Sequence, residues 1–222
     1  MLWPTLVVDD FFKNVDAVID YSKTLKFFKT DGKYPGERTK PLHVDEENFF
    51  KKVTSKIIAC YYPNELQSPN LRWTAVSYFQ KIKTKDHANL GFVHQDRDEA
   101  FTSIVYLTEE ENTGTSLYRL IKESNKTENY IPTKIKGYLN VKHQKSKKFK
   151  NVLKENLDSY QKTLEFTSLK NRMIMFDGSQ YHAASSFGKK QKERLTLITF
   201  FKNVYFRDGT PLKYHLNECY KI

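Results

Sequence analysis

The chain of 222 residues is 39% hydrophobic and 14% aromatic, which excludes a disordered protein and fits one folded domain over residues 1–222. Its formal net charge of +11 comes from 30 lysines and only 7 arginines set against 26 acidic residues. Since arginine is the residue that recognises phosphate or guanine in a bidentate manner, this charge does not favour a nucleic-acid partner.

The sequence predicts neither a membrane segment nor a disulfide framework. No run reaches the roughly 20 apolar residues of a membrane span, and the first residues lack the basic and apolar regions of a secretory signal. Two cysteines, Cys60 and Cys219, are too few for a disulfide framework. We expect a cytoplasmic protein with both thiols reduced and no membrane partner.

Residues 1–65 predict a short strand followed by two helices. The β-branched run Leu6 to Val8 indicates the strand. Apolar residues then recur at helical spacing from Asn14, the expected N-cap, to the turn at Asp31. We therefore expect the first helix between these two residues.

A loop and the second helix come next. Prolines and glycines in the stretch 32–43 predict the loop, and the second helix is expected to run from a cap at Asp45 to Pro63. Within the loop, the segment Tyr34 to Thr39 (YPGERT) suits either a plain turn or a lid over a substrate site. Both interpretations stay open at this point.

From residue 71 onward the pattern changes to a period of two. Short β-branched or aromatic segments, separated by Gly, Asn, Asp and Lys, predict seven or eight strands and hence a sandwich or barrel. These segments are 73–82, 90–93, 101–107, 115–120, 172–176, 182–186 and 194–200. The polar, lysine-rich stretch 121–170 is too long for an ordinary connection, so we expect an insertion there.

Two His-x-Asp triplets are candidates for metal ligands, His43-Val44-Asp45 and His94-Gln95-Asp96. Asp45 stands at the start of a predicted helix, where capping and the helix dipole explain an acid, so His43 is expected to be a loop residue. His94 instead follows an apolar extended run. Because alternate residues of an extended chain face the same side, His94 and Asp96 can bind one metal.

A third ligand is expected at His182, which follows the Asp177-Gly178 turn in a strand context. Two histidines and one carboxylate form the facial triad of non-haem Fe(II) oxygenases. Twelve residues further on, Arg194 opens an apolar strand with Thr196 on the same face. A guanidinium there requires an anion, and the far carboxylate of a dicarboxylate would bind it in a bidentate manner.

In their order, and with the segment RMIMFDGSQYHAASSFG around the second histidine, these five residues resemble the 2-oxoglutarate- and Fe(II)-dependent dioxygenases. The prolyl-4-hydroxylase-like branch is the most similar, because SIVYLT followed by Thr113-Gly114-Thr115 resembles a strand and turn of that branch. The likeness covers about residues 71–203 apart from the insertion 121–170, which does not match, and residues 1–65 fit it more loosely.

The resemblance implies a mainly β fold, the double-stranded β-helix of jelly-roll or cupin type, with the N-terminal helices on its outer face. It implies Fe(II) bound by His94, Asp96 and His182, with O2 as the oxidant. It also implies that 2-oxoglutarate is the cosubstrate. The expected contacts with 2-oxoglutarate are Arg194, Thr196 and Tyr106 at its distal carboxylate and Tyr78 near its metal-chelating end.

The implied reaction is hydroxylation of an unactivated C–H bond. A peptide or protein side chain, such as proline, is the first expectation for the substrate, and a free amino acid or another small molecule is the second. Two alternatives stay open, a nucleic-acid-modifying oxygenase and a non-catalytic β-helix binding module. The nucleic-acid branch carries a second arginine near the position of Phe200, which this chain lacks.

Overall fold

The computed structural model describes residues 3–64, 66–83, 91–110, 113–122, 130–188, 193–206 and 211. Its described strands form two antiparallel sheets. The seven-stranded sheet contains, in spatial order, β1 (Leu6–Val8), β8 (Met173–Asp177), β5 (Phe101–Tyr106), β10 (Glu193–Tyr205), β4 (Arg72–Lys83), β3 (Glu37–Thr39) and β2 (Phe27–Lys29). The three-stranded sheet contains β7 (Tyr160–Thr167), β6 (Gly114–Leu120) and β9 (Tyr181–Ser186).

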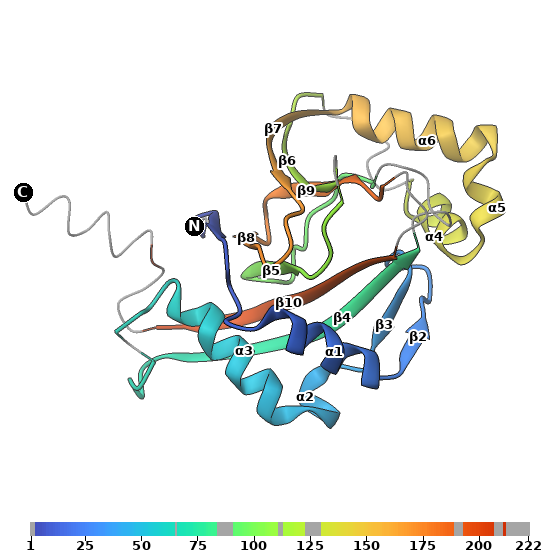
Figure 1. Cartoon of the computed structure of the whole chain (residues 1–222). Helices are drawn as coiled ribbons and strands as arrows, with labels where there is room; N and C mark the ends of the chain where they lie inside the picture. Colours follow the sequence, from blue (N-terminus) through green and yellow to red (C-terminus); the bar gives the residue numbers. More distant parts are fainter. Residues whose placement is uncertain are drawn as a thin grey trace, which may run out of the picture.

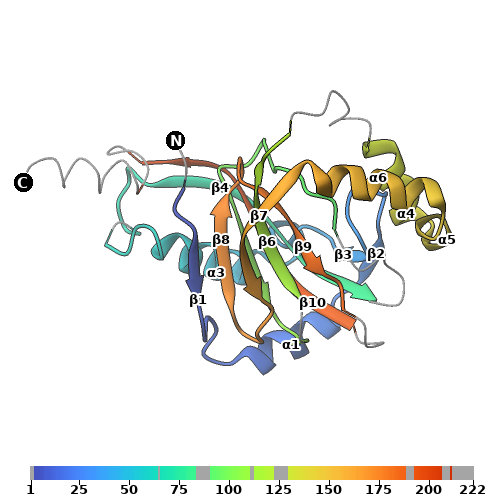
Figure 2. The ribbon, with the colours of Figure 1, turned by 90° about the horizontal axis from the view of Figure 1, so that it is seen from above.

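The described helices fall into two groups. Figure 1 shows α1 and α3 on one side of β10 and β4, with the small sheet on the other side. The remaining long helices lie at the end of the molecule where β2 and β3 lie, as Figure 2 also shows. The bounds are α1 (Val15–Thr24), α2 (Leu42–Asp45), α3 (Glu47–Ala59), α4 (Ile131–Leu139), α5 (Val141–Gln144) and α6 (Lys147–Asp158). None of these helices is long and apolar enough to cross a membrane.

Strand β10 separates two environments because its side chains alternate between its faces. Leu195, Leu197 and Phe201 are buried in the main core with apolar residues of α1 and α3. Arg194 and Thr196 point the other way and line a cavity between the two sheets. The same strand therefore supplies both the core and one wall of the cavity.

The predicted fold class, a mainly β double-stranded β-helix with N-terminal helices, is confirmed by this architecture. The strands expected over 73–82, 101–107, 115–120, 172–176, 182–186 and 194–200 all form, with small shifts at their ends. The segment expected at 90–93 differs, because the described residues 91–94 form no regular strand and pair with β9 through one hydrogen bond from Gly91 to Ala184 and an isolated bridge between His94 and His182. Leu90 and Cys219 lie outside the described residues, and Cys60 is a free thiol.

The predicted boundaries in the N-terminal third are partly wrong. Asn14 caps α1 as expected, since its side chain accepts a hydrogen bond from the backbone N–H of Ala17. The helix ends at Thr24 rather than near Asp31, because the following residues form β2.

The expected loop 32–43 is also partly ordered, since Glu37–Thr39 forms β3 and pairs with β2 and β4. Asp45 is not a cap but the last residue of α2, so His43 is helical as well, and the N-cap of α3 is Glu46 without a side-chain hydrogen bond.

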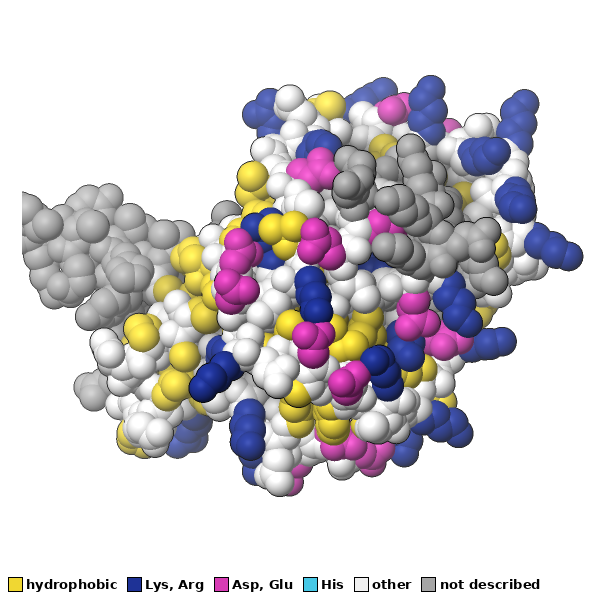
Figure 3. All heavy atoms as spheres, in the orientation of Figure 1, with side chains coloured by type: hydrophobic (Ala, Val, Ile, Leu, Met, Phe, Trp, Pro, Cys, Tyr) yellow, Lys and Arg dark blue, Asp and Glu magenta, His cyan; other side chains and the backbone are white. Residues whose placement is uncertain are grey.

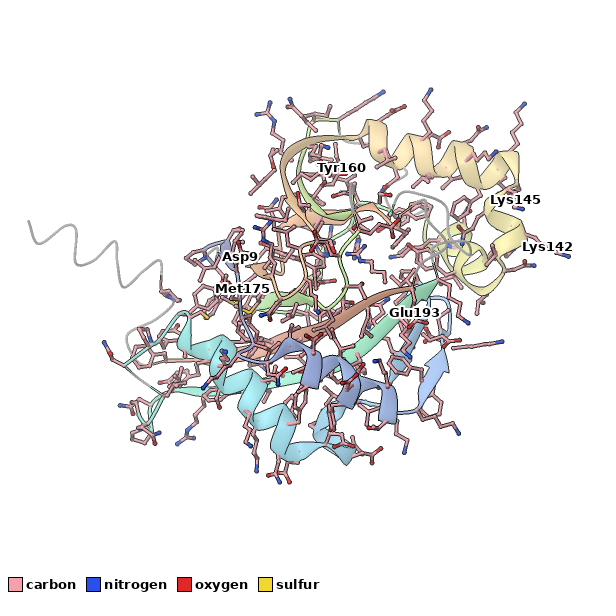
Figure 4. All side chains as sticks on the ribbon, in the orientation of Figure 1. Asp9, Lys142, Lys145, Tyr160, Met175 and Glu193 are labelled. Carbon is pink, nitrogen blue, oxygen red and sulfur yellow. The ribbon has the colours of Figure 1, made fainter. Side chains whose placement is uncertain are left out.

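The expected insertion 121–170 is wrong at its C-terminal end. Residues 160–167 form β7, which pairs along the whole of β6 and belongs to the small sheet. Only Tyr160 and Phe166 of β7 are buried, so its sequence is as polar as a loop. Helices α4 to α6 account for 131–158, and 123–129 lie outside the described residues. Lys142 of α5 and Lys145, which follows this helix, project away from the body of the protein (Figure 4).

Candidate metal centre

A cavity of about 500 Å³ opens between the two sheets. The large sheet contributes side chains from β3, β4, β5 and β10, the small sheet contributes β6 and β9, and α4 adds Lys134 and Tyr138. Six of the seven predicted site residues line this cavity: Tyr78, His94, Asp96, His182, Arg194 and Thr196. Residues from distant parts of the chain therefore converge at one place.

His94 and His182 are brought together by backbone pairing. The N–H of His94 donates to the carbonyl of His182 at 3.0 Å, and the N–H of His182 donates to the carbonyl of His94 at 2.9 Å. Directly paired residues of antiparallel strands project their side chains to the same side. The two imidazole rings accordingly lie with their centroids 4.4 Å apart.

Asp96 faces both rings. Its Oδ1 lies 3.8 Å from Nε2 of His94, and its Oδ2 lies 3.5 Å from Nε2 of His182. Ligand atoms of the three residues all lie within 4.8 Å of one another. Thr102 orients the carboxylate by donating to Oδ2 at 2.7 Å. The three side chains thus present their donor atoms to one point.

The hydrogen-bond pattern leaves the correct nitrogen free on each ring. Nδ1 of His94 lies 2.9 Å from the carbonyl of Phe92, and Nδ1 of His182 lies 2.9 Å from the carbonyl of Gln180. A carbonyl only accepts, so Nδ1 carries the proton and Nε2 keeps its lone pair. Burial, and then the charge of Lys134, lower the pKa of His94, so the neutral ligand form is favoured.

The carboxylate is in its ligand form as well. Desolvation alone would raise the pKa of Asp96, but His182, His94 and the hydrogen bond from Thr102 together bring it below its ordinary value. An anionic carboxylate and two neutral imidazoles are the donor set that suits a divalent transition metal. The chemistry of the residues therefore fits a metal ion.

Arg194 lies deeper in the cavity and is only 8% exposed. Its Nη1 and Nη2 donate to the carbonyls of Ser186 and Gly114, both at a long 3.3 Å, and its buried Nε has no partner among the described residues. Burial lowers the pKa of Arg194. A buried guanidinium with such weak neutral partners is suited to an incoming anion.

Tyr106 stands behind the cavity instead of lining it. Its side chain is fully buried, its hydroxyl donates to Oγ1 of Thr115 at 2.7 Å, and its ring lies 5.5 Å from the guanidinium carbon of Arg194. Thr115 does line the cavity. Tyr106 therefore orients two residues of the wall.

Three residues of the cavity have no sequence motif that would have identified them. Arg38 lies in β3, Lys134 in α4 and Thr102 in β5. Each comes from a segment with ordinary local composition, and only the pairing of the strands and the position of α4 turn them toward the metal ligands. The Tyr34 to Thr39 segment is thus more than a plain turn, because its last three residues form β3 and Tyr34, Pro35 and Arg38 line the cavity.

The other histidine triplet lies elsewhere. His43 is exposed on α2 and packs edge-on against Phe50 at 5.6 Å, while Asp45 pairs with Lys40 at 3.3 Å. Neither residue lines the cavity described above.

Comparison with known proteins gives one family and a set of similar folds. The family of unknown function DUF6445 matches residues 3–201. No curated protein sequence matches the chain.

Among solved structures, HygX from Streptomyces hygroscopicus, solved with nickel and 2-oxoglutarate bound, is 12% identical, with a TM-score of 0.55 over 93% of this chain and 84% of its own. The non-haem α-ketoglutarate-dependent epimerase SnoN from nogalamycin biosynthesis is 10% identical, with a TM-score of 0.54 over 94% and 81%. A prolyl hydroxylase from Trichoplax adhaerens, in complex with a hypoxia-inducible-factor peptide, is 11% identical, with a TM-score of 0.50 over 96% and 86%. At these identities the likeness shows the fold, which is that of the 2-oxoglutarate- and Fe(II)-dependent oxygenases, as the sequence resemblance implied.

Proposed function

The chain belongs to DUF6445, a family of unknown function, and we propose that it is an Fe(II)- and 2-oxoglutarate-dependent dioxygenase that hydroxylates an unactivated C–H bond. One observation carries the proposal. Three metal-ligand side chains and a buried, weakly partnered arginine, from three separate segments of the chain, face the same cavity. A binding module without catalysis would have no need for both.

Fe(II) would be held by His94, Asp96 and His182. The two Nδ1 hydrogen bonds and the hydroxyl of Thr102 fix the orientation of the three ligands before a metal arrives. Such outer hydrogen bonds raise metal affinity because the ligands do not have to be ordered on binding.

2-Oxoglutarate would extend from the metal toward β10. Its distal carboxylate would bind Arg194 and accept from the hydroxyl of Thr196, which lies two residues along the same face. Tyr106 would act on 2-oxoglutarate indirectly. Its hydroxyl group would orient Thr115, and its ring would pack behind the guanidinium of Arg194. Tyr78 lines the cavity near Asp96, which fits its expected place near the metal-chelating end.

With iron and 2-oxoglutarate bound, one oxygen atom of O2 enters the succinate formed by decarboxylation and the other becomes the hydroxyl group of the product. The protein contributes orientation and a dry cavity. The substrate class follows the two expectations already stated, a peptide side chain such as proline or a free amino acid or other small molecule. Figure 3 shows lysine and arginine interspersed with acidic side chains over the centre of this face, while basic side chains gather at the edge where α5 and α6 lie.

An anaerobic titration of the protein with Fe(II) and 2-oxoglutarate tests the proposal without a substrate. Chelation of a 2-oxo acid to Fe(II) gives a visible metal-to-ligand charge-transfer band, and we expect this band in the wild-type protein and its loss in Asp96→Ala. The matched control is Asp45→Ala, which removes the exposed acid of the other triplet, His43-Val44-Asp45. This variant should keep the band. Absence of the band in folded, metal-loaded wild-type protein would favour the non-catalytic binding module.

A further inference from the structure

We propose that the substrate is a small molecule bearing a carboxylate, and that Arg38 and Lys134 bind this carboxylate beside the metal centre. The inference rests on the proposed function and names its substrate class. Both side chains line the same cavity as the three candidate ligands. They come from opposite parts of the fold, Arg38 from β3 and Lys134 from α4.

Arg38 is held in place without an ionic partner. Its guanidinium carbon lies 4.0 Å from the ring centroid of Tyr34, 5.3 Å from that of Tyr78 and 5.4 Å from that of Phe200. Nη2 donates to Oε1 of Gln80 at 3.3 Å, and the buried Nε has no partner among the described residues. The rings and the glutamine orient the guanidinium, but none of them neutralises its charge.

Lys134 is the second cation without an anion. In the part of the chain that the structure describes, its ammonium group makes no hydrogen bond or ion pair, and its nearest aromatic contact is Tyr138 at 5.8 Å. Burial lowers the pKa of Lys134 to about 8, so the charged form still predominates at neutral pH. A lysine on an exposed helix would ordinarily extend into water, yet this one lines the cavity.

Among the described residues that line the cavity, the charges would balance except for these two once a metal and 2-oxoglutarate are bound. Asp31 and Lys33, also in the wall, pair with each other at 3.3 Å. The divalent metal and Arg194 together balance Asp96 and the two carboxylates of 2-oxoglutarate. Arg38 and Lys134 would then be left as two positive charges on the described part of the wall, which is unfavourable unless an anion accompanies the substrate.

Arg38 and Arg194 reach the cavity from different strands, with β4 lying between β3 and β10. Arg38 is in register with Gln80 of β4, which is in register with Thr196 of β10, and its guanidinium carbon lies 5.4 Å from the ring centroid of Phe200. Because Arg194 is assigned to the distal carboxylate of 2-oxoglutarate, we take the anion bound by Arg38 to be a second one. A guanidinium also pairs most favourably with a planar carboxylate.

The size of the cavity points to a small molecule. The cavity holds about 500 Å³, and next to its wall residues Asp31 and Lys33, Gly32 packs closely against Ile135 of α4. Tyr34, Tyr78 and Phe200 offer apolar surface next to the guanidinium. A compact acid with a hydrocarbon body fits this wall better than an extended peptide.

Ligand-observed NMR on the protein saturated with Mn(II) and 2-oxoglutarate, in the absence of Fe(II), tests the proposal. Paramagnetic relaxation by Mn(II) reports binding near the metal without any turnover. The probes are phenylacetate, hexanoate and N-acetylproline, each compared with its neutral amide, and a tetrapeptide with a free C-terminal carboxylate. The variants are Arg38→Gln and Lys134→Met, with Lys136→Met, an exposed lysine of the same helix, as the control.

We expect at least one small acid to bind wild-type protein about tenfold or more tightly than its amide, which is the usual size of one charge-assisted contact. This preference should fall below about threefold in Arg38→Gln and Lys134→Met and persist in Lys136→Met. Equal binding of every acid and its amide, or a preference that both variants retain, would overturn the inference. Preferential binding of the peptide would overturn its small-molecule part.

The charge-transfer titration of the wild-type protein distinguishes a failure of this inference from a failure of the proposed function. If the band forms and no acid is preferred, the dioxygenase assignment holds and the carboxylate site is wrong. If no band forms although an acid is preferred, the dioxygenase assignment fails while the cationic pair remains an acid-binding site.

Discussion

The side chain of Asn156 forms two hydrogen bonds with the peptide groups of Val93. Val93 N–H donates to Oδ1 at 2.7 Å, and Nδ2 donates to the Val93 carbonyl at 3.1 Å. Val93 is fully buried and directly precedes the candidate ligand His94. Helix α6, which contains Asn156, therefore braces the backbone of the metal centre.

Replacing Asn156 with alanine should weaken both the fold and the metal centre. It leaves a buried N–H and a buried C=O without partners, a loss of about 2 to 4 kcal/mol. Because the segment before His94 loses its support, metal affinity should fall about tenfold or more. Denaturant unfolding and Co(II) titration measure the two effects. Asn151→Ala, at an exposed position of the same helix, is the control, and an unchanged metal affinity would show that Asn156 acts on stability alone.

Gly178 is required by the close approach of two backbone segments. A Cβ at this position would lie 2.0 Å from the carbonyl oxygen of Glu99 and 2.6 Å from that of Asp96. The N–H of Asp96 also donates to the Gly178 carbonyl at 2.9 Å. We expect Gly178→Ala to displace this segment, lower the unfolding free energy by about 2 kcal/mol or more and reduce metal affinity.

Gly91→Ala is the control for Gly178→Ala, because it tests whether any alanine at a closely packed glycine lowers metal affinity. At Gly91 the nearest atom to an added Cβ is the backbone nitrogen of Ala184 at 3.0 Å, so Gly91→Ala requires a shift of only a few tenths of an ångström. Its effect on metal affinity should be clearly smaller. Equal losses in both variants would argue against a specific role of the Gly178 contact.

A pH-dependent ion pair joins the ends of β1 and β8. Arg172 donates from Nε and Nη2 to the two carboxylate oxygens of Asp9 at 2.6 and 2.8 Å, and this hydrogen bonding lowers the pKa of Asp9 below 3.8. Because the folded-state pKa is the lower one, the contribution to stability is present above pH 3.8 and is lost as the pH falls through the lowered pKa.

Asp9 is largely exposed, so we expect Asp9→Asn to cost less than about 1 kcal/mol at pH 7. The difference from wild type should shrink as the pH is lowered from about 5 toward 3. Urea unfolding at several pH values measures it, and Asp20→Asn, at an exposed helical pair with Lys23, should change stability by no more than a few tenths. A difference that grows on acidification would contradict the assigned sign.

The long strands and most of the residues that line the candidate site could be predicted because local pattern and chemistry agree there. In β10 the alternation of buried apolar residues with Arg194 and Thr196 is visible in the sequence, whereas its pairing with β4 and β5 is known only from the structure. His94 and Asp96 are recognisable because a polar triplet interrupts an apolar run. These features depend only on the spacing of polar and apolar residues along the chain.

Other parts depend on tertiary contacts that spacing does not encode. Strand β7 buries two side chains among eight residues, since the other face of this edge strand meets water, so its composition matched a loop. Arg38 follows a Pro-Gly turn in a three-residue strand, and Lys134 is one of 30 lysines. Only the position of α4 and the pairing of β3 with β4 identify these two side chains as part of the cavity.

Removal of Arg194 should have opposite effects on stability with and without 2-oxoglutarate. Without it, the buried guanidinium has only two long hydrogen bonds and an unpartnered Nε, so Arg194→Gln should leave the unfolding temperature unchanged or raise it. Addition of Mn(II) and 2-oxoglutarate should raise the unfolding temperature of the wild-type protein by mass action, and this rise should largely disappear in the variant.

The same substitution separates cosubstrate binding from metal binding. Affinity for 2-oxoglutarate should fall about 10- to 100-fold, the range of a lost bidentate charge-assisted contact, whereas Mn(II) affinity without 2-oxoglutarate should change less than about threefold because Arg194 touches none of the three ligands. Calorimetry of both steps makes the comparison, with Arg119→Gln, an exposed arginine of β6 bound to Gln161, as the control. If Mn(II) and 2-oxoglutarate affinities fell in parallel, Arg194 would be a structural support of the cavity and the distal carboxylate would have to bind elsewhere.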